Sequence, residues 1–287
     1  MKTFDQIVGN TPLVKVSEGI YGKLETYSPT GSVKDRLVHY LISKAQKNGE
    51  VGENTTLCEA TSGNTGIALS AVAASMRLKC KIFMPSNMSV ERRNMMTSLG
   101  ASIEYSGPND FAGAIEMRND FLKTSGTWSP YQFSNPDNVE CHMTTTAPEI
   151  QRDVQKLGTE WSAFVHGSGT GGTIEGVRRF VIDTGRKTKV CMVQPYEDFH
   201  GIQGIGDGKD YLANPNDMDS TIKIKTKDAI QRAKKFAADT GILVGISSGA
   251  NILACESWKK KNSVEGIVVT MLCDRGERYM SIYGERK

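Results

Sequence analysis

Apolar runs of strand length alternate with longer segments of helical periodicity along most of the chain. The runs at 55–60, 79–85 and 101–106 are each followed by apolar residues spaced three and four positions apart. The alternation resumes at 163–167 and continues through 189–195, 242–247 and 266–272. The predicted helices cover 64–76, 89–100, 110–126, 172–185 and 226–241, and one more begins near Gly249. This order predicts parallel β-sheets covered by helices on both faces.

The alternation falls into two blocks, which predicts two α/β domains with a cleft between them. The 287 residues are enough for two domains of ordinary size. Pro136 and Asn138 interrupt the pattern and mark the expected crossing from the first block to the second.

A further helix is predicted within PTGSVKDRLVHY and the residues that follow it. Ser32 is the expected N-cap, with Asp35 three residues on as in a short capping box, and Gly49 is the expected stop. Lys34 then lies in the first helical turn, where the positive end of the helix dipole disfavours a cation by roughly 0.3–1 kcal/mol. The same dipole favours the neutral amine, so it is expected to lower the pKa of Lys34.

Four glycine-rich turns stand where parallel α/β proteins bind ligands, at the carboxyl ends of predicted strands and beside helix starts. Residues 61–66 read TSGNTG, which suits a carboxylate or a phosphate, or is an ordinary capped turn. Residues 167–173 read GSGTGGT, whose glycines and hydroxyls favour a phosphate site over a bare turn. Residues 245–249 predict a capped helix start, and residues 201–208 predict a mobile or tightly turning loop.

The loop at 167–173 contains a GxGxxG match, yet a dinucleotide is poorly supported. The following strand closes on Gln194, where a dinucleotide-binding chain carries an acid for the ribose. A phosphate loop together with the lysine at 34 instead suggests pyridoxal phosphate (PLP), with its aldehyde on the amine as a Schiff base. The alternative for Lys34 is a solvated surface lysine.

Composition narrows the function classes without naming one. The net charge of +3 gives no reason to expect a nucleic-acid partner, and no apolar run approaches the roughly 18 residues of a membrane span. The first residues lack the apolar centre of a signal peptide. The six cysteines include no CxxC pair, and three of them, Cys80, Cys191 and Cys273, are expected within strands. Buried free thiols are therefore preferred to a metal site or disulfides, and a cytoplasmic location is expected.

Ordered motifs run almost from end to end: GNTPLVK around Asn10, KLE, GSVKDR, EATSGNTGIAL, MPSNMSVERR, QFSNPDN, TTTAPEI, GSGTGGT, GISSGA and CDRGERYMS. By these motifs the chain resembles the fold-type-II PLP enzymes, and among them the cysteine synthases (O-acetylserine sulfhydrylases), with the B-type closest. The resemblance implies a tryptophan synthase β-like fold: two three-layer α/β domains with mostly parallel sheets and the active site in the cleft between them. The expected domains are residues 1–8 with 28–136, and residues 9–27 with 137–287.

The resemblance also implies a role for individual residues. Lys34 matches the Schiff-base lysine that moves the α-proton, Asn64 the partner of the cofactor's ring hydroxyl, and Ser247 the partner of its pyridine nitrogen. The matches to the phosphate loop are Gly167, Ser168, Gly169, Thr170, Gly171 and Thr173, and the matches to the substrate-binding residues are Thr61, Ser62, Gly63, Thr65, Gln132 and Gly204.

The implied reaction is a β-replacement that makes L-cysteine from O-acetyl-L-serine through an aminoacrylate. Ser62 and the CDRGERYMS ending follow the B-type, which is associated with thiosulfate use, whereas HGIQGIGDG follows the A-type. The donor therefore stays open between sulfide and thiosulfate, which would give S-sulfocysteine. A homodimer is implied, and a complex with serine acetyltransferase stays open; no metal is expected.

Other functions remain open at this stage. A cystathionine β-synthase-like enzyme or a serine or threonine dehydratase would share the fold and Lys34. A non-catalytic binding partner has no physical need for Lys34, Asn64 and Ser247 together. A nicotinamide enzyme lacks its ribose-binding acid.

Overall fold

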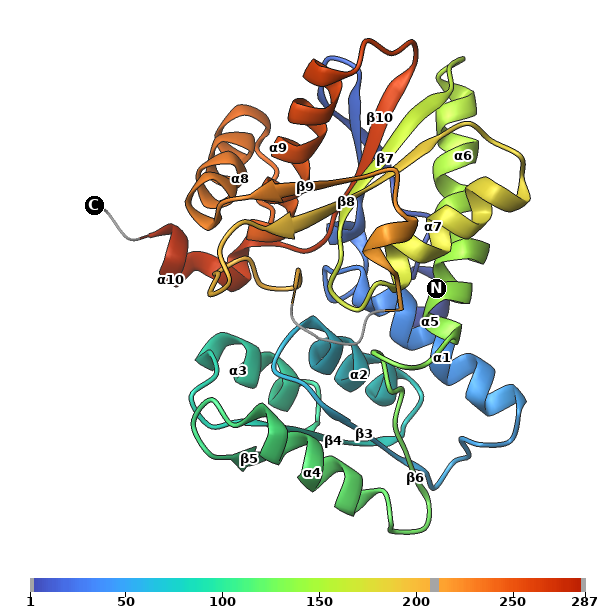
Figure 1. The fold of residues 1–287 in the computed structure, drawn as a ribbon. Helices are drawn as coiled ribbons and strands as arrows, with labels where there is room; N and C mark the ends of the chain where they lie inside the picture. Colours follow the sequence, from blue (N-terminus) through green and yellow to red (C-terminus); the bar gives the residue numbers. More distant parts are fainter. Residues whose placement is uncertain (1–2, 207–211, 285–287) are drawn as a thin grey trace. The chain divides into compact units, whose positions relative to one another are not determined.

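The computed structural model describes residues 3–206 and 212–284. The chain divides into two compact units, residues 1–8 with 28–131 and residues 9–27 with 132–287. The chain therefore passes from the second unit into the first at residue 28 and returns at residue 132. Each unit is built on its own sheet (Figure 1).

The first unit contains a parallel four-stranded sheet in the order β5-β4-β3-β6. Side chains alternate across it, as the pleat requires. Ile82 and Met84 of β4 pack with α1, α2 and α3, whereas Phe83 packs with α4 on the opposite face. The elements are a 3₁₀ turn at Phe4–Gln6, α1 Lys34–Lys47, β3 Thr56–Ala60, α2 Asn64–Ser75, β4 Lys79–Pro85, α3 Val90–Ser98, β5 Ser102–Ser106, α4 Phe111–Phe121 and β6 Thr127–Trp128.

The second unit contains a six-stranded sheet in the order β1-β2-β10-β7-β8-β9, parallel except for the β1–β2 hairpin. Helices α8 and α9 cover one face, and α6 and α7 lie on the other side (Figure 1). The strands are β1 Leu13–Ser17, β2 Ile20–Leu24, β7 Trp161–Gly167, β8 Lys189–Pro195, β9 Ser220–Ile224 and β10 Ile267–Leu272. The helices are α5 Asp137–Cys141, α6 Ala147–Lys156, α7 Gly172–Asp183, α8 Thr226–Thr240, α9 Ile246–Lys261 and α10 Met280–Tyr283, with a π-helical turn at His142–Thr146 and 3₁₀ turns at Glu25–Tyr27, Pro215–Asp217 and Gly276–Tyr279.

Three local predictions are wrong. Residues 242–247 are not a strand: Val244 makes a single bridge to Arg275, and α9 already begins at Ile246. The physical reason is that β10 is paired on both sides, with β2 and β7, so this run finds no free sheet edge beside it. Cys273, expected within a strand, follows the last residue of β10.

The capping prediction is the third. Helix α1 begins at Lys34 with Val33 as its N-cap, and Asp35 turns back to accept hydrogen bonds from the N–H and hydroxyl of Thr30. The stop at Gly49 is confirmed, since α1 ends at Lys47 and Gly49 adopts a φ of +77°.

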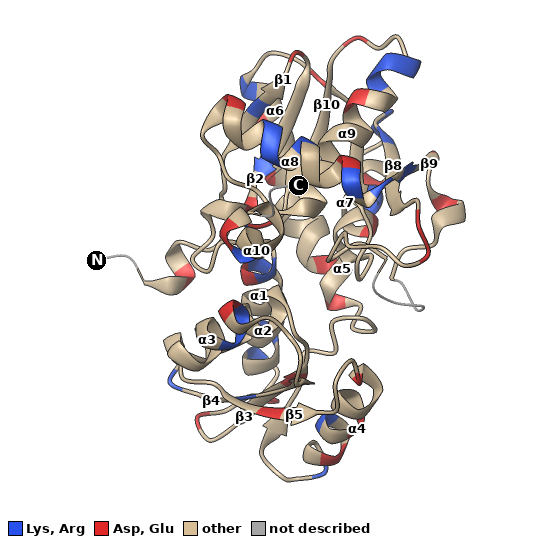
Figure 2. Ribbon diagram, turned by 90° about the vertical axis from the view of Figure 1, so that its left-hand side faces the viewer, with Lys and Arg blue, Asp and Glu red and all other residues tan. Residues whose placement is uncertain are grey.

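Charge is spread over both units. Figure 2 shows Lys and Arg interspersed with Asp and Glu along the helices. All six cysteines are free thiols, and five of them are buried. Within the described ranges, no helix is long and apolar enough to cross a membrane.

Candidate active site

Lys34 is the first residue of α1 and so lies in the first helical turn, where the sequence predicts it. A tight turn precedes it, in which the N–H of Gly31 donates to the carbonyl of Ser28 at 2.8 Å and Gly31 adopts a φ of +84°. The hydroxyl of Ser32 accepts the backbone N–H of Lys34 at 3.3 Å. The Lys34 side chain is half-buried. The tight turn and this hydrogen bond thus place a lysine at the positive end of the helix dipole.

The turn from Thr61 to Thr65 joins β3 to α2, which begins at Asn64. The N–H of Thr61 donates to Phe83 O at 3.0 Å, which ties the turn to the next strand. The N–H of Gly63 donates to the Thr61 hydroxyl at 3.4 Å. Thr61 and Thr65 are buried, whereas Ser62, Gly63 and Asn64 are half-buried. The structure therefore brings these five predicted residues together at one helix start.

A buried ion pair adjoins this turn and was missed in the sequence. Glu59, the next-to-last residue of β3, contacts Arg118 of α4, with 2.7 Å between Oε1 and Nη1. The same guanidinium donates to the Ser129 hydroxyl at 3.2 Å and lies over the ring of Tyr131, 4.5 Å from its centroid. The 59 residues that separate the two charges explain why no local pattern reveals the pair.

Residues 167–173 join β7 to α7, which begins at Gly172. Two glycines here are required by the backbone. Gly171 adopts a φ of +87°, and a Cβ on it would lie 2.5 Å from the backbone nitrogen of Ala213; a Cβ on Gly169 would lie 2.4 Å from Gly204 O. The loop is therefore pressed against residues 204 and 213, and only glycine permits that approach.

The glycine-rich segment at 201–206 packs directly on this loop. The N–H of Gly206 donates to Ser168 O at 2.8 Å, and Ile205 fills the space beside Gly167. Gly204 adopts a φ of +86°. Asp207 and Gly208, also in the predicted loop, lie outside the described residues.

Ser247 is the second residue of α9 and is buried. One turn later, Asn251 accepts the N–H of Gly167 at 2.9 Å and donates to Met271 O at 3.0 Å and to His166 Nδ1 at 3.1 Å. Asn251 therefore fixes the start of the 167–173 loop to the helix that carries Ser247. Sequence reasoning missed it, because its partner Gly167 is 84 positions away.

Gln132, the remaining predicted residue, is buried, and its carbonyl accepts from the side chain of Asn138 at 2.8 Å. The predicted residues thus fall into two groups. Lys34 and the residues from Thr61 to Thr65 belong to the first unit, and Gln132, the 167–173 loop, Gly204 and Ser247 belong to the second.

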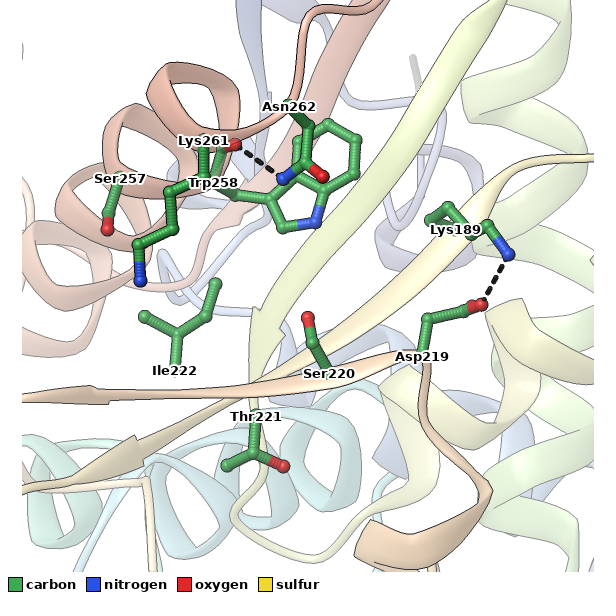
Figure 3. A pocket seen from close by; sticks show the side chains of 9 residues that line it. All are labelled: Lys189, Asp219, Ser220, Thr221, Ile222, Ser257, Trp258, Lys261 and Asn262. Atoms are coloured by element: carbon green, nitrogen blue, oxygen red, sulfur yellow. Dashed lines mark hydrogen bonds and ion pairs between the residues drawn. The ribbon is translucent and has the colours of Figure 1, made fainter.

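A surface pocket of about 330 Å³ contains none of the predicted residues. It lies between the edge strand β9 and the end of α9, with the Lys189–Asp219 ion pair on one side and Asn262 bonded to Trp258 O on the other (Figure 3). Its lining offers no glycine-rich turn and no helix start, so the pocket and the predicted site are separate features.

Comparison with known proteins decides the family. The model of the family described as pyridoxal-phosphate dependent enzyme matches residues 4–274. The chain belongs to this family. It is 38% identical to cysteine synthase B of Escherichia coli strain K12 over 99% of this chain and 97% of that protein. The predicted family, the PLP cofactor and the type of enzyme are confirmed.

Solved structures agree with this placement. Cysteine synthase (OASS) from Entamoeba histolytica matches with a TM-score of 0.92 at 34% identity, over 100% of this chain and 92% of that one. The O-acetylserine dependent cystathionine beta-synthase from Helicobacter pylori matches with a TM-score of 0.88 at 33% identity, over 98% and 97%. The predicted α/β fold class is confirmed.

The loop at 167–173 fits the phosphate of this family's cofactor. The Ser168 hydroxyl is buried and has no hydrogen-bond partner within the part of the chain that the structure describes. The first N–H groups of α7 have no intrahelical acceptor and point out of the helix start. A buried hydroxyl and helix-start amides are donors that suit a phosphate.

Cys58 and Cys80 are poor candidates for chemistry in this enzyme. Burial raises the pKa of the Cys58 thiol to about 12, with a smaller contribution from the neighbouring Glu59 carboxylate. Burial likewise raises the pKa of Cys80 to about 12. Because the thiolate is the nucleophile, these side chains are inert at neutral pH.

Proposed function

We propose that this enzyme makes L-cysteine and acetate from O-acetyl-L-serine and sulfide, with PLP as its cofactor. The observation that carries the proposal is the 167–173 loop with its buried, unpartnered Ser168 hydroxyl, in a chain that matches cysteine synthase B over 99% of its length. The loop residues Gly167, Ser168, Gly169, Thr170, Gly171 and Thr173 would hold the phosphate. Ser247 would face the pyridine nitrogen, and Asn64 the ring hydroxyl.

When bound, PLP withdraws electrons from the amino acid's Cα and so makes the α-proton acidic. Lys34 would hold the cofactor covalently and, once the substrate has displaced it, take the α-proton on its Nζ. Acetate leaves from Cβ, sulfide forms the new bond at Cβ, and Nζ of Lys34 returns the proton to Cα. The position of Lys34 at a helix start supports this role, because the dipole favours a neutral amine that can accept a proton.

The substrate's α-carboxylate would be bound by the turn from Thr61 to Thr65 and by Gln132, with Gly204 beside it. An anion suits this turn because α2 begins there and its first N–H groups lack intrahelical acceptors. The buried pair of Glu59 and Arg118 supports the role by fixing the strand end from which the turn leaves. The turn and the loop would thus bind two different anions.

The test uses purified enzyme loaded with PLP. O-acetylserine should shift the visible absorbance of the lysine-bound cofactor, and sulfide should restore it with one cysteine formed per substrate. Lys34→Ala should lower kcat by roughly 10³-fold or more. The matched control is Lys47→Ala, in the last turn of the same helix and exposed, which should keep full activity. Full turnover in Lys34→Ala would refute the assignment.

The likeness to the O-acetylserine dependent cystathionine beta-synthase favours a second candidate, in which a thiol such as homocysteine replaces sulfide. Parallel assays with sulfide, thiosulfate and homocysteine, each with O-acetylserine or serine, would rank the donors and acceptors by kcat/KM. We rank sulfide with O-acetylserine first. A higher kcat/KM for homocysteine would replace the first candidate with the second.

Assembly and location are further parts of the proposal. We propose a homodimer in the cytoplasm, on the resemblance and on the free cysteines. Light scattering of the pure enzyme tests the first point. Co-purification with a serine acetyltransferase tests the complex that the sequence leaves open.

A further inference from the structure

Asn138 of α5 is fully buried beside the 167–173 loop. Its Nδ2 donates to the Gln132 carbonyl at 2.8 Å and to the Thr170 hydroxyl oxygen at 3.0 Å. Helices α5 and α7 lie side by side in the second unit (Figure 1). One buried amide therefore connects a residue expected at the substrate carboxylate with one expected at the cofactor phosphate.

The chemistry of the partners fixes the orientation of this amide. A backbone carbonyl can only accept, so the group that faces Gln132 must be the NH₂ group. The second proton of the same NH₂ group then goes to Thr170, whose oxygen also accepts the N–H of Gly172 at 3.3 Å. In the described part of the chain, the Thr170 hydroxyl donates to no acceptor. Its own proton is left for a ligand.

The other end of the amide is closed off by α7. The Asn138 Oδ1 is buried without a hydrogen-bond partner among residues 3–206 and 212–284. A Cβ on Gly172 would lie 1.9 Å from this oxygen. Gly172 therefore leaves room for Asn138 to pack against the first residue of α7, and the amide has no space to turn.

We propose that Asn138 is a positioning residue that makes the Thr170 hydroxyl a permanent donor to the phosphate of PLP. By occupying the lone pairs of Thr170, Asn138 and Gly172 direct its proton to the anion. The same side chain holds the backbone of Gln132, so the cofactor loop and the carboxylate-binding residue share one anchor. The inference rests on the proposed function.

The test compares PLP with pyridoxal, which lacks the phosphate. Asn138→Asp offers only acceptor oxygens, so the Thr170 proton would turn towards the new carboxylate. PLP should bind this variant about 10- to 100-fold more weakly, because a charge-assisted hydrogen bond is lost. Pyridoxal, followed by its visible absorbance on the enzyme, should bind within about two-fold of wild type. An equal loss for both ligands would overturn the proposal.

A double-mutant cycle separates the hydrogen bond from the added charge. Thr170→Val alone should weaken PLP but not pyridoxal binding, by the same roughly 10- to 100-fold. In that background the neutral Asn138→Ser should cost less than about two-fold, although it costs more when Thr170 is present. Asn138→Ser also carries the test if the aspartate variant does not fold. Equal losses from Asn138→Ser in both backgrounds would show that Asn138 acts independently of Thr170.

Failure of this inference can be distinguished from failure of the proposed function. If the variants show this coupling in PLP binding but the wild-type enzyme forms no cysteine, the proposed reaction is refuted and the inference stands. Wild-type protein that binds PLP no more tightly than pyridoxal would overturn the inference, even if cysteine is formed.

Discussion

Replacing Asn251 with leucine tests whether one buried side chain fastens the cofactor loop to α9. Leucine has the same branched shape and the same number of side-chain heavy atoms and a slightly better helix propensity, but it cannot hydrogen-bond. The change removes the acceptor of the Gly167 N–H and the donor to the Met271 carbonyl and to His166 Nδ1. The hydrogen bonds that Asn251 makes are thereby lost without opening a cavity.

The size of the effect follows from these three bonds. A buried N–H without an acceptor costs roughly 1–3 kcal/mol, and the lost bonds to Met271 and His166 add about 0.5–1.5 kcal/mol each. The helix propensity of leucine returns less than about 0.5 kcal/mol. Asn251→Leu should therefore lower the free energy of unfolding by about 1.5–6 kcal/mol. PLP affinity should fall as well, because Gly167 begins the phosphate loop.

Urea unfolding of the apoenzyme, followed by circular dichroism, measures the loss as a shift of the midpoint at constant slope. The matched control is Asn262→Leu at the end of the same helix, where an exposed side chain donates to Trp258 O at 2.8 Å (Figure 3). That exposed change should cost less than about 0.5 kcal/mol. Equal losses in the two variants would refute the reasoning.

Three further predictions concern other parts of the molecule. Gly171→Ala should cost at least about 1–2 kcal/mol of unfolding free energy, because Gly171 adopts a φ of +87° and the new Cβ would lie 2.5 Å from the Ala213 nitrogen; an unchanged urea midpoint would contradict this. Burial alone would raise the pKa of Asp153, but hydrogen bonds from Arg152 and Lys156 and the charge of Lys23 outweigh it and hold the pKa below its ordinary 3.8. Asp153 should therefore stabilise the fold fully above pH 3.8 and lose that contribution as the pH falls through its lowered pKa. In acid unfolding, the variant Lys23→Met should lose less unfolding free energy than wild type over the same pH range. Cys58 should resist alkylation in the folded enzyme at pH 8, since burial raises its pKa to about 12. If Cys58 is labelled as fast in the folded enzyme as in the urea-unfolded chain, the thiol is not buried as described.

Much of the secondary structure could be predicted because its signals are local. The helix predicted at 226–241 is α8 at Thr226–Thr240, and the strand predicted at 79–85 is β4. The hairpin of β1 and β2 was not predicted, because Gly22 reads locally as a strand breaker. In the structure a Cβ on Gly22 would lie 2.7 Å from Leu272 Cγ, so that glycine serves a close approach of β10 from the far end of the chain.

The candidate site divides in the same way. The turns at Thr61 and Gly167 follow strands and precede helices, which sequence patterns reveal. Asn138 and Asn251 stand inside helices, and no local pattern reveals their positioning role, since their partners in the loop are 32 and 84 residues away. The residues expected to contact ligands could therefore be predicted from the sequence, whereas the residues that hold the loop in place are recognised only in the structure.

The placement of β2 between β1 and β10 has a consequence for the order in which the enzyme is made. Strand β2 ends at Leu24, and its neighbour β10 begins at Ile267, so the ribosome completes nearly the whole chain before this sheet can close. All residues of the sheet at β3–β6 emerge earlier, within 28–131. Strand β2 can pair with β1 as soon as both are made, but its second neighbour is among the last strands to be synthesised, and a chain cut before Ile267 would leave β2 and β7 without the strand between them.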